Sequence, residues 1–214
     1  MAVGCLPRTK MKSTIIKALI RVINFLDRND FPQVGLQNGT NRDQWIEKTL
    51  KKIPDGLKIL DVGAGELPYK KYCDHLDYTS QDFNQYDGKG DGSGFQTDEW
   101  NTSKIDIVCD ITDIPVESVS FEAIMCTEVL EHLPDPISAL KEFDRILKPG
   151  GYLIITAPFC SMTHFAPYHF ATGFNRYFYE YWMGELAFEI LELQTNGNYF
   201  EYLGQELRRV TKGC

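Results

Sequence analysis

A short apolar run that breaks into a glycine-rich turn constrains the fold of this chain most strongly. Residues 57–62 are the apolar run typical of a buried strand, and Gly63, Ala64 and Gly65 follow at once. The two glycines permit a tight turn and let the backbone come close to a ligand. Residues 66–74 are predicted as a short helix, whose first N–H groups lack intrahelical partners. The sequence therefore predicts a strand–turn–helix unit with a ligand site at the turn.

Apolar runs and helical patterns alternate through the rest of the chain. The predicted strands are residues 57–62, 78–82, 105–109, 121–126, 152–157 and 188–194, and the predicted helices are 43–52, 66–74, 136–147, 175–186 and 199–210. Residues 85–97 are rich in Gly and Asp and are expected to form a loop. This alternation predicts an α/β fold with a doubly wound, mostly parallel sheet.

Two classes of ligand use a glycine turn of this kind. A dinucleotide cofactor requires the pattern G-x-G-x-x-G, in which the last glycine allows close packing beneath the pyrophosphate. Pro68 stands at that last position here. The sequence therefore argues against a dinucleotide.

The segment from Ile59 to Pro68 resembles the first motif of class I S-adenosylmethionine-dependent methyltransferases, a strand ending in D/E-x-G-x-G. Four further features agree with the small-molecule, type 11-like branch of this family. Asp82 ends the second strand, and Asp110 follows the third. Residues 126–136, CTEVLEHLPDP, and residues 147–151, LKPGG, resemble the motifs on either side of the next helix. The resemblance covers roughly residues 59–157 and implies the Rossmann-like sheet of that family.

The resemblance also implies the cofactor, S-adenosylmethionine, with S-adenosylhomocysteine as the product. In the family, the acid at Asp82 accepts hydrogen bonds from the ribose hydroxyls, and the positions of Asp110 and Ile111 bind adenine. Independently of the family, carboxylates at strand ends along one sheet edge lie where open α/β sheets bind ligands. The expected cofactor-binding residues are Asp61, Gly63, Ala64, Gly65, Asp82, Phe83, Asp110, Ile111, Thr127 and Glu128.

Three histidines are candidates for catalysis. The methyl donor is already activated, so the protein mainly has to align a nucleophile and remove its proton. His132 follows the fourth predicted strand, and His164 and His169 follow the fifth, where family members close over the acceptor. Each histidine is a candidate base, and each could instead line or support the pocket. His75 is expected at the surface.

The region after the fifth strand is dense in aromatic residues. Residues 159–182 either pack the next helix against the core or form a wall for an acceptor ring. Arg176 within this segment could hold an anionic group. The stretch 167–177 resembles methyltransferases of polysaccharide and natural-product biosynthesis, which favours O-methylation of a sugar or natural-product hydroxyl. The alternative is a methyltransferase-like protein that binds ligand or partner without catalysis.

Composition limits the classes of partner and cofactor that we expect for this chain. The formal net charge is −8, and no basic patch is evident, so we expect no nucleic-acid partner. The six cysteines form neither a CxxC pair nor a Cys/His cluster, which indicates reduced thiols, a cytoplasmic location and no metal site. A metal held by the acceptor and loop carboxylates is left open.

The two ends of the chain carry further expectations. Residues 12–26 have helical apolar spacing interrupted by basic side chains, which indicates a helix packed on the domain or lying on a membrane surface. We expect a helical extension over residues 1–52 and the methyltransferase domain over residues 53–214. No seventh strand follows the last helix. Truncation is the favoured explanation, beside a strand from a partner or a six-stranded sheet. An exposed edge strand would permit an oligomer.

Overall fold

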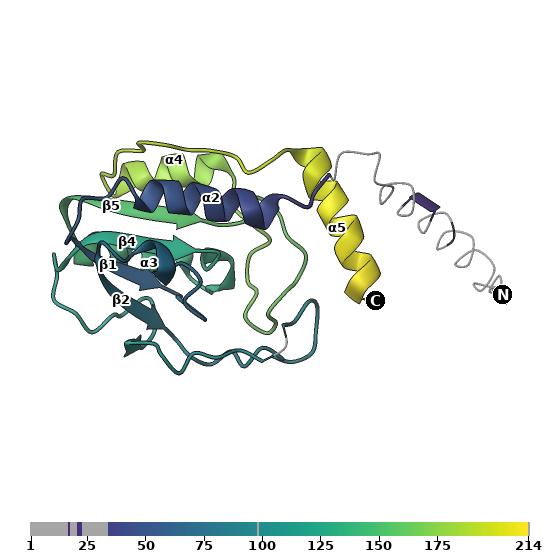
Figure 1. The fold of residues 1–214 in the computed structure, drawn as a ribbon, viewed down its shortest axis with the longest axis horizontal. Helices are drawn as coiled ribbons and strands as arrows, with labels where there is room; N and C mark the ends of the chain where they lie inside the picture. The colour runs from purple at the N-terminus through teal and green to yellow at the C-terminus, as the bar shows by residue number, and fades with distance from the viewer. Residues whose placement is uncertain (1–16, 18–20, 23–33, 98, 214) are drawn as a thin grey trace, which may run out of the picture. The chain divides into compact units, whose positions relative to one another are not determined.

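The computed structural model describes residues 17, 21–22, 34–97 and 99–213. Within these residues, five parallel strands form one sheet in the order β3-β2-β1-β4-β5 (Figure 1). The strands are β1 (Lys58–Val62), β2 (Asp77–Asp82), β3 (Ile107–Val108), β4 (Phe121–Thr127) and β5 (Leu147–Thr156). The predicted fold class, a doubly wound α/β sheet, is confirmed.

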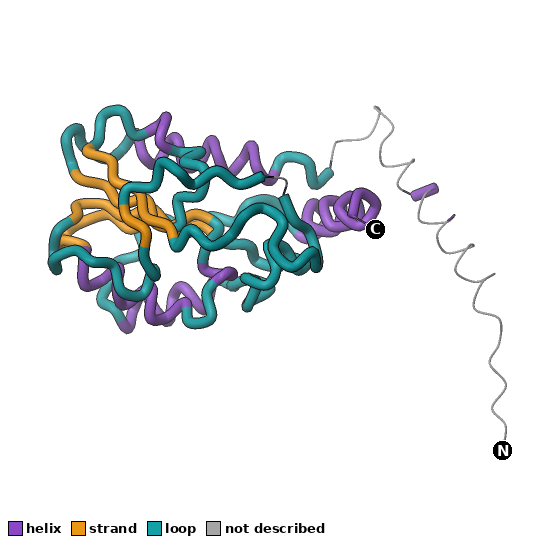
Figure 2. The backbone as a smooth tube through the Cα atoms, turned by 90° about the horizontal axis from the view of Figure 1, so that it is seen from below, coloured by secondary structure: helices purple, strands orange, loops and turns teal. Residues whose placement is uncertain are grey.

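Helices cover both faces of this sheet (Figure 2). Side chains alternate along a strand, so Leu60 and Val62 of β1 face one layer while Ile59 faces the other. The first face packs against α3 (Pro136–Ile146) and α4 (Arg176–Glu185). The second packs against α2 (Asn38–Leu50), through Ile46 and Leu50, which are fully buried. Because both faces are covered, β1 and β4 read as nearly continuous apolar runs.

The observed elements differ from the predicted ones mostly at their ends. The predicted helix 43–52 begins earlier, at Asn38, and β3 is shorter than residues 105–109. β5 begins at Leu147, but its regular pairing with β4 starts at Tyr152, after an irregularity over the Lys-Pro-Gly-Gly turn. α3 starts where expected, because Asp135 accepts hydrogen bonds from the N–H groups of Ile137 and Ser138.

The predicted helix over residues 66–74 is wrong for most of its length. Only a single 3₁₀ turn, η1 (Lys70–Tyr72), forms there. Leu67 has a φ of 61°, in the left-handed region, and Pro68 follows it. A left-handed residue followed by proline cannot continue a right-handed helix, because it reverses the backbone and removes an N–H donor.

The predicted sixth strand, residues 188–194, is also wrong. The segment is irregular in the structure, and no strand pairs with the outer edge of β5 in the described part of the chain. Leu191 and Leu193 are exposed, at 76% and 46%. Their alternating apolar pattern has the period of a strand, but a strand also requires a neighbour to complete its hydrogen bonds.

Residues 34–40 and 196–213 belong to a second compact unit, separate from residues 41–195. It contains the last helix, α5 (Tyr199–Gly213), close to its predicted position. A side chain at Gly35 would meet the α5 backbone at 2.4 Å, so glycine lets the two segments touch. The Asn38 amide donates to Gln205 Oε1 at 2.9 Å.

The predicted N-terminal helix, residues 12–26, lies outside the described residues except for Lys17, Arg21 and Val22, which are helical. The expected membrane contact through this helix and the domain boundary at residue 52 stay predictions. None of the described helices combines the length and the apolar character that a membrane span requires.

Candidate active site

The candidate site lies beside β1 and β4, where the order of the strands along the sheet reverses. β1 lies next to β4, so the chain proceeds outward to β3 on one side and to β5 on the other. Open α/β sheets bind ligands at the carboxyl ends of the strands beside such a point. Two turns meet there: the glycine turn after β1, and η2 (Leu130–His132) after β4. The predicted cofactor turn and the first candidate base are therefore brought to one edge.

The glycine turn is held in shape by the end of β2. Gly63 and Gly65 have φ values of 65° and 51°, which glycine adopts without strain. The N–H of Gly65 donates to Asp82 Oδ2 at 2.9 Å, and the N–H of Asn84 donates to Oδ1 at 2.8 Å. Each carboxylate oxygen has two lone pairs, so Asp82 can still accept two further hydrogen bonds. These contacts fit the expected role of Asp82 towards a ribose diol.

Asp61 lies beneath the turn and is buried. Its Oδ2 accepts a hydrogen bond from the Tyr78 hydroxyl at 2.7 Å. Burial raises the pKa of Asp61 to about 7; the Tyr78 hydrogen bond opposes this shift, and the nearby Asp82 adds to it. In this structure its carboxylate is therefore buried and bonded to Tyr78 of β2.

The remaining predicted cofactor residues beside β1, β2 and β3 line the same edge. Ala64 is buried, and its N–H donates to the Gln81 carbonyl at 2.9 Å. Ile111 is buried, whereas Asp110 is exposed and its Oδ1 accepts hydrogen bonds from the Thr112 N–H and hydroxyl. Phe83 packs edge-on against Tyr168, with the ring centroids 5.0 Å apart.

Thr127 and Glu128 lie at the end of β4. Glu128 has a φ of 55° and forms an ion pair with Arg42 of α2, with Oε2 2.7 Å from the guanidinium. Its Oε1 accepts a hydrogen bond from Thr156 at 3.0 Å, while the buried hydroxyl of Thr127 has no hydrogen-bond partner among the described residues. Arg42 was not among the predicted site residues. Its helix precedes the first motif, and nothing in the sequence connects it to Glu128.

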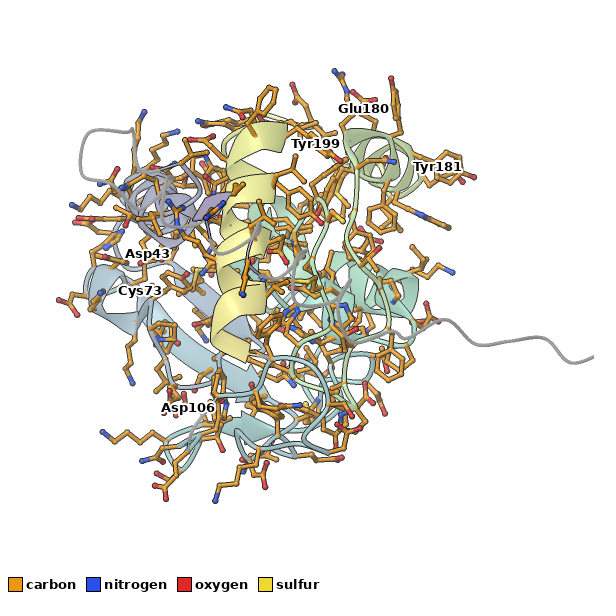
Figure 3. The ribbon with its side chains drawn as sticks, turned by 90° about the vertical axis from the view of Figure 1, so that its right-hand side faces the viewer. Asp43, Cys73, Asp106, Glu180, Tyr181 and Tyr199 are labelled. Atoms are coloured by element: carbon orange, nitrogen blue, oxygen red, sulfur yellow. The ribbon has the colours of Figure 1, made fainter. Side chains whose placement is uncertain are left out.

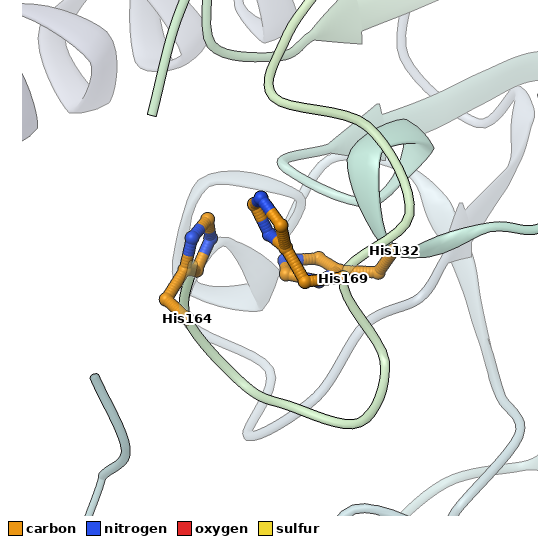
Figure 4. Close-up of side chains that lie close together, drawn as sticks. All are labelled: His132, His164 and His169. Carbon is orange, nitrogen blue, oxygen red and sulfur yellow. The ribbon is translucent and has the colours of Figure 1, made fainter. Parts of the chain in front are cut away.

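The three candidate histidines come together, although 31 residues or more separate His132 from the other two. Figure 4 shows His132 at the end of the β4 segment and His164 and His169 on the loop after β5. The ring centroids of His132 and His164 are 4.7 Å apart, and those of His164 and His169 are also 4.7 Å apart. One nitrogen of each ring lies within 4.8 Å of the others. The sequence indicated no metal site here.

A buried carboxylate accompanies the histidines. Glu131 is fully buried, and its Oε1 lies 3.7 Å from His132 Nε2 and 3.9 Å from His164 Nε2. Burial raises the pKa of Glu131 to about 8, and the charge of Glu128 adds to the shift. Burial lowers the pKa of His132 to about 4, against the hydrogen bond of its ring with the Tyr168 carbonyl. Glu131 was not among the predicted site residues, although its place in the segment Leu130-Glu131-His132-Leu133, directly after a buried strand, was a signal for a buried acid.

Two loops cover this edge and are paired with each other. The N–H of Phe95 donates to the Thr163 carbonyl at 3.0 Å, and the N–H of Phe165 donates back to Phe95 at 2.9 Å. Tyr86 stacks on Phe165 at 4.8 Å, and Trp100 packs edge-on against both rings. Phe165 also stacks on His132 at 5.2 Å. Tyr86, Phe95 and Trp100 thus join their part of the chain to the histidine loop.

The aromatic segment of α4 divides between core and surface. Phe178, Tyr179 and Trp182 pack against the core, which supports the packing interpretation for this helix. Arg176 is exposed and forms an ion pair with Glu180, which lies on the outside of α4 (Figure 3). Its predicted contact with an anionic group stays a prediction.

The sequence of this edge matches a known family. Residues 60–155 match the family model described as a methyltransferase domain (type 11). This range runs from the β1 motif to the end of β5 and includes Asp82, the glycine turn and His132. This match confirms the predicted resemblance of residues 60–155 to the class I, type 11 methyltransferases.

Relatives among characterised proteins share part of this range. The chain is 32% identical over 108 residues to the ubiquinone biosynthesis O-methyltransferase of Actinobacillus pleuropneumoniae, covering 47% of this chain and 45% of that one. It is 27% identical over 122 residues to the enzyme of the same name from Leptothrix cholodnii, covering 54% and 49%. The chain therefore spans about half the length of these curated relatives.

Solved structures agree on the fold. The YcgJ protein from Bacillus subtilis aligns with a TM-score of 0.56 at 14% identity, covering 80% of this chain and 82% of that one. A SAM-dependent methyltransferase from Archaeoglobus fulgidus aligns with a TM-score of 0.50 at 13% identity, covering 79% and 88%. At these identities the likeness establishes the Rossmann-like fold.

Proposed function

We propose that this chain transfers a methyl group from S-adenosylmethionine to a hydroxyl oxygen of a small-molecule acceptor. The observation that carries the proposal is the glycine turn locked to Asp82 at the same sheet edge as the three histidines. This edge offers a cofactor cradle and potential proton acceptors side by side. The match of residues 60–155 to a methyltransferase domain supports the same activity.

The cofactor, when bound, supplies a methyl group on a positively charged sulfur. The acceptor oxygen forms a bond to that carbon, the carbon–sulfur bond breaks, and its electron pair stays on the sulfur of S-adenosylhomocysteine. In our proposal Asp82 holds the ribose, and Asp110 and Ile111 hold the adenine. Phe83, Thr127 and Glu128 line the remainder of the cofactor edge.

The histidine cluster takes the proton that the acceptor hydroxyl loses. The ring Nδ1 of His132 bonds the Tyr168 carbonyl, and the Nδ1 of His164 bonds the Met162 carbonyl at 2.9 Å. Carbonyl oxygens only accept, so each Nδ1 carries the hydrogen and each Nε2 presents a lone pair. His132 and His164 are therefore disposed as proton acceptors, with His169 beside them.

The acceptor that we propose is a ring-bearing hydroxyl compound. Tyr86, Trp100 and Phe165 pack against one another beside the histidines and give the site an aromatic border, which favours an apolar, ring-bearing acceptor. The relatives are named as O-methyltransferases of ubiquinone biosynthesis, which favours a hydroxyl on an aromatic ring over the sugar hydroxyl expected from the sequence. Sugars and natural-product hydroxyls remain the comparison set in the test.

The first test is calorimetric titration of S-adenosylhomocysteine into wild type and Asp82→Asn. We expect binding to weaken about 10- to 100-fold in the variant, because a charge-assisted hydrogen bond contributes roughly 1.5–3 kcal/mol. Asp77→Asn is the matched control, since Asp77 is exposed at the other end of β2. Equal weakening in both variants would contradict the assignment of Asp82.

The second test offers a dihydroxylated aromatic ring and a set of sugars to the enzyme with methyl-labelled S-adenosylmethionine. Label in the aromatic product supports the proposal. Label in a sugar alone would overturn the acceptor class but leave the reaction. Tight S-adenosylhomocysteine binding with no transfer to either set would favour a non-catalytic, methyltransferase-like protein.

A further inference from the structure

Three lone-pair atoms converge at the end of β4. Glu131 Oε1 lies 3.7 Å from His132 Nε2 and 3.9 Å from His164 Nε2. Glu131 is fully buried, and the two histidine side chains are only 13% and 12% exposed. Both distances are too long for a hydrogen bond between the atoms. The three groups therefore face a common space without bonding one another directly.

The tautomers of the His132 and His164 rings leave no hydrogen on the nitrogens that face Glu131. Since the two Nδ1 atoms bond backbone carbonyls, both Nε2 atoms are acceptors, like the carboxylate that they face. Neither carboxylate oxygen of Glu131 accepts a hydrogen bond from the described residues, and His132 Nε2 is buried without a donor. Buried acceptors without a donor are costly. A cation in the common space would satisfy the Glu131 carboxylate and His132 Nε2.

His169 adds a third imidazole to the group. One nitrogen each of His132, His164 and His169 lies within 4.8 Å of the others (Figure 4). The backbone next to His169 is tied to the same carboxylate residue, because the N–H groups of Phe170 and Ala171 both donate to the Glu131 carbonyl, at 2.9 and 3.1 Å. The loop and the end of β4 thus hold the four side chains together.

We propose that Glu131, His132, His164 and His169 form a binding site for a divalent metal ion of the zinc type. Three imidazoles and one carboxylate are ligands that Zn²⁺, Co²⁺ and related ions prefer. Histidine ligands are commonly oriented by a hydrogen bond from the other ring nitrogen to a carbonyl, as His132 and His164 are. Ligand nitrogens around one zinc ion lie about 3.3 Å apart, so the rings close inward by side-chain rotation when the ion binds.

The position of this metal site gives the ion a chemical role. With the ion bound, the Nε2 lone pairs of His132 and His164 are occupied and no longer take the acceptor's proton. The ion instead lowers the pKa of a coordinated hydroxyl group, so the proton leaves to water before the methyl group arrives. This role rests on the proposed function, since it needs an acceptor hydroxyl at the same edge. Binding of the ion itself does not depend on that function.

The test is a titration of the full, metal-stripped chain with Co²⁺, followed by visible absorption. We expect one equivalent of Co²⁺ to give d–d bands of a low-coordinate nitrogen and oxygen site, and Zn²⁺ to displace them. His164→Gln and His169→Gln should each weaken Co²⁺ binding at least tenfold. His75→Gln is the matched control, because His75 is half-buried on the Leu50 carbonyl and outside the cluster.

Titration with S-adenosylhomocysteine on the same samples separates the two proposals and verifies folding. Nucleoside binding without cobalt bands would overturn the metal site and leave the methyltransferase assignment. Cobalt bands without nucleoside binding would support the metal site and contradict the proposed methyl transfer. Equal loss of cobalt binding in His75→Gln and His164→Gln would also contradict the site, since the loss would then reflect general destabilisation of the folded chain.

Discussion

Two aspartates at the ends of β1 and β2 are buried in different ways. Asp82 accepts two backbone N–H groups, whereas Asp61 accepts a single hydroxyl hydrogen bond from Tyr78. A carboxylate that is buried with little hydrogen bonding favours its neutral form, because desolvation penalises the charge. Asp61 is therefore one residue through which the stability of the sheet depends on pH.

We expect the stability of the wild type to fall between pH 5 and pH 8 through Asp61. The pKa of Asp61 is raised to about 7 from an ordinary value near 3.8, so the folded state binds more protons than the unfolded state between these values. Stability from this group is thus present at low pH and lost as pH rises through 7. The change is roughly 2–3 kcal/mol, measured by urea unfolding at both pH values.

Asp61→Asn should remove the part of this pH dependence that Asp61 contributes, because an amide does not ionise, and the part that comes from Glu131 should remain. Asp77→Asn, an exposed aspartate at the start of β2, should leave it unchanged. An unaltered pH profile in Asp61→Asn would show that other groups produce the effect.

Pairing of the two covering loops depends on a close backbone approach. A Cβ at Gly94 would lie 2.4 Å from the Thr163 carbonyl oxygen, next to the hydrogen bond from Phe95. Gly92 has a similar positive φ, 77° against 68°, but has open space around its Cα. Comparing an alanine at position 94 with an alanine at position 92 therefore separates the effect of the lost loop contact from the effect of backbone strain.

We expect Gly94→Ala to part the loops and Gly92→Ala to leave them joined. Amide hydrogen exchange at Phe95 and Phe165 should accelerate at least tenfold in Gly94→Ala relative to Gly92→Ala, because the added methyl group excludes the carbonyl that Phe95 bonds. Methyl transfer should fall in parallel, since the histidine loop loses its support. Equal exchange in the two variants would contradict the pairing.

At the scale of the whole molecule, ligand binding at one edge should stabilise the entire sheet. S-adenosylhomocysteine at 100 times its Kd stabilises the folded state by about 2.7 kcal/mol. For a chain of this size, that corresponds to a rise in Tm of about 5–10 °C, measured by calorimetry. Gly65→Ala should abolish the rise, because Gly65 has a φ of 51° and its Cβ would lie 2.7 Å from the Trp100 ring.

Gly56→Ala provides the control for this experiment. Gly56 precedes β1 and has a φ of 78°, with nothing near an added Cβ. It should lower the Tm without ligand and still show the full rise with S-adenosylhomocysteine. A full rise in Gly65→Ala would mean that the ligand does not approach the glycine turn.

Local patterns in the sequence predicted most of the regular structure. The apolar runs of β1 and β4 and the capped helix α3 carry their own signals, because buried strands and N-caps are defined by adjacent residues. The segment of residues 188–194 carries a strand pattern as well, but pairing requires a partner elsewhere in the chain. The helix predicted after the glycine turn failed because of a left-handed Leu67, which no residue type announced.

The sequence by itself determined the fold class, the glycine turn and the family of residues 60–155, since motif order and strand periodicity are local properties of the chain. Only the tertiary structure brought His164 to Glu131, and Arg42 to Glu128. These contacts join loops and helices that are distant in sequence, and their geometry depends on how β4 and β5 pack side by side. Burial, which sets the charge state of Glu131, is likewise a property of the folded sheet and its covering loops.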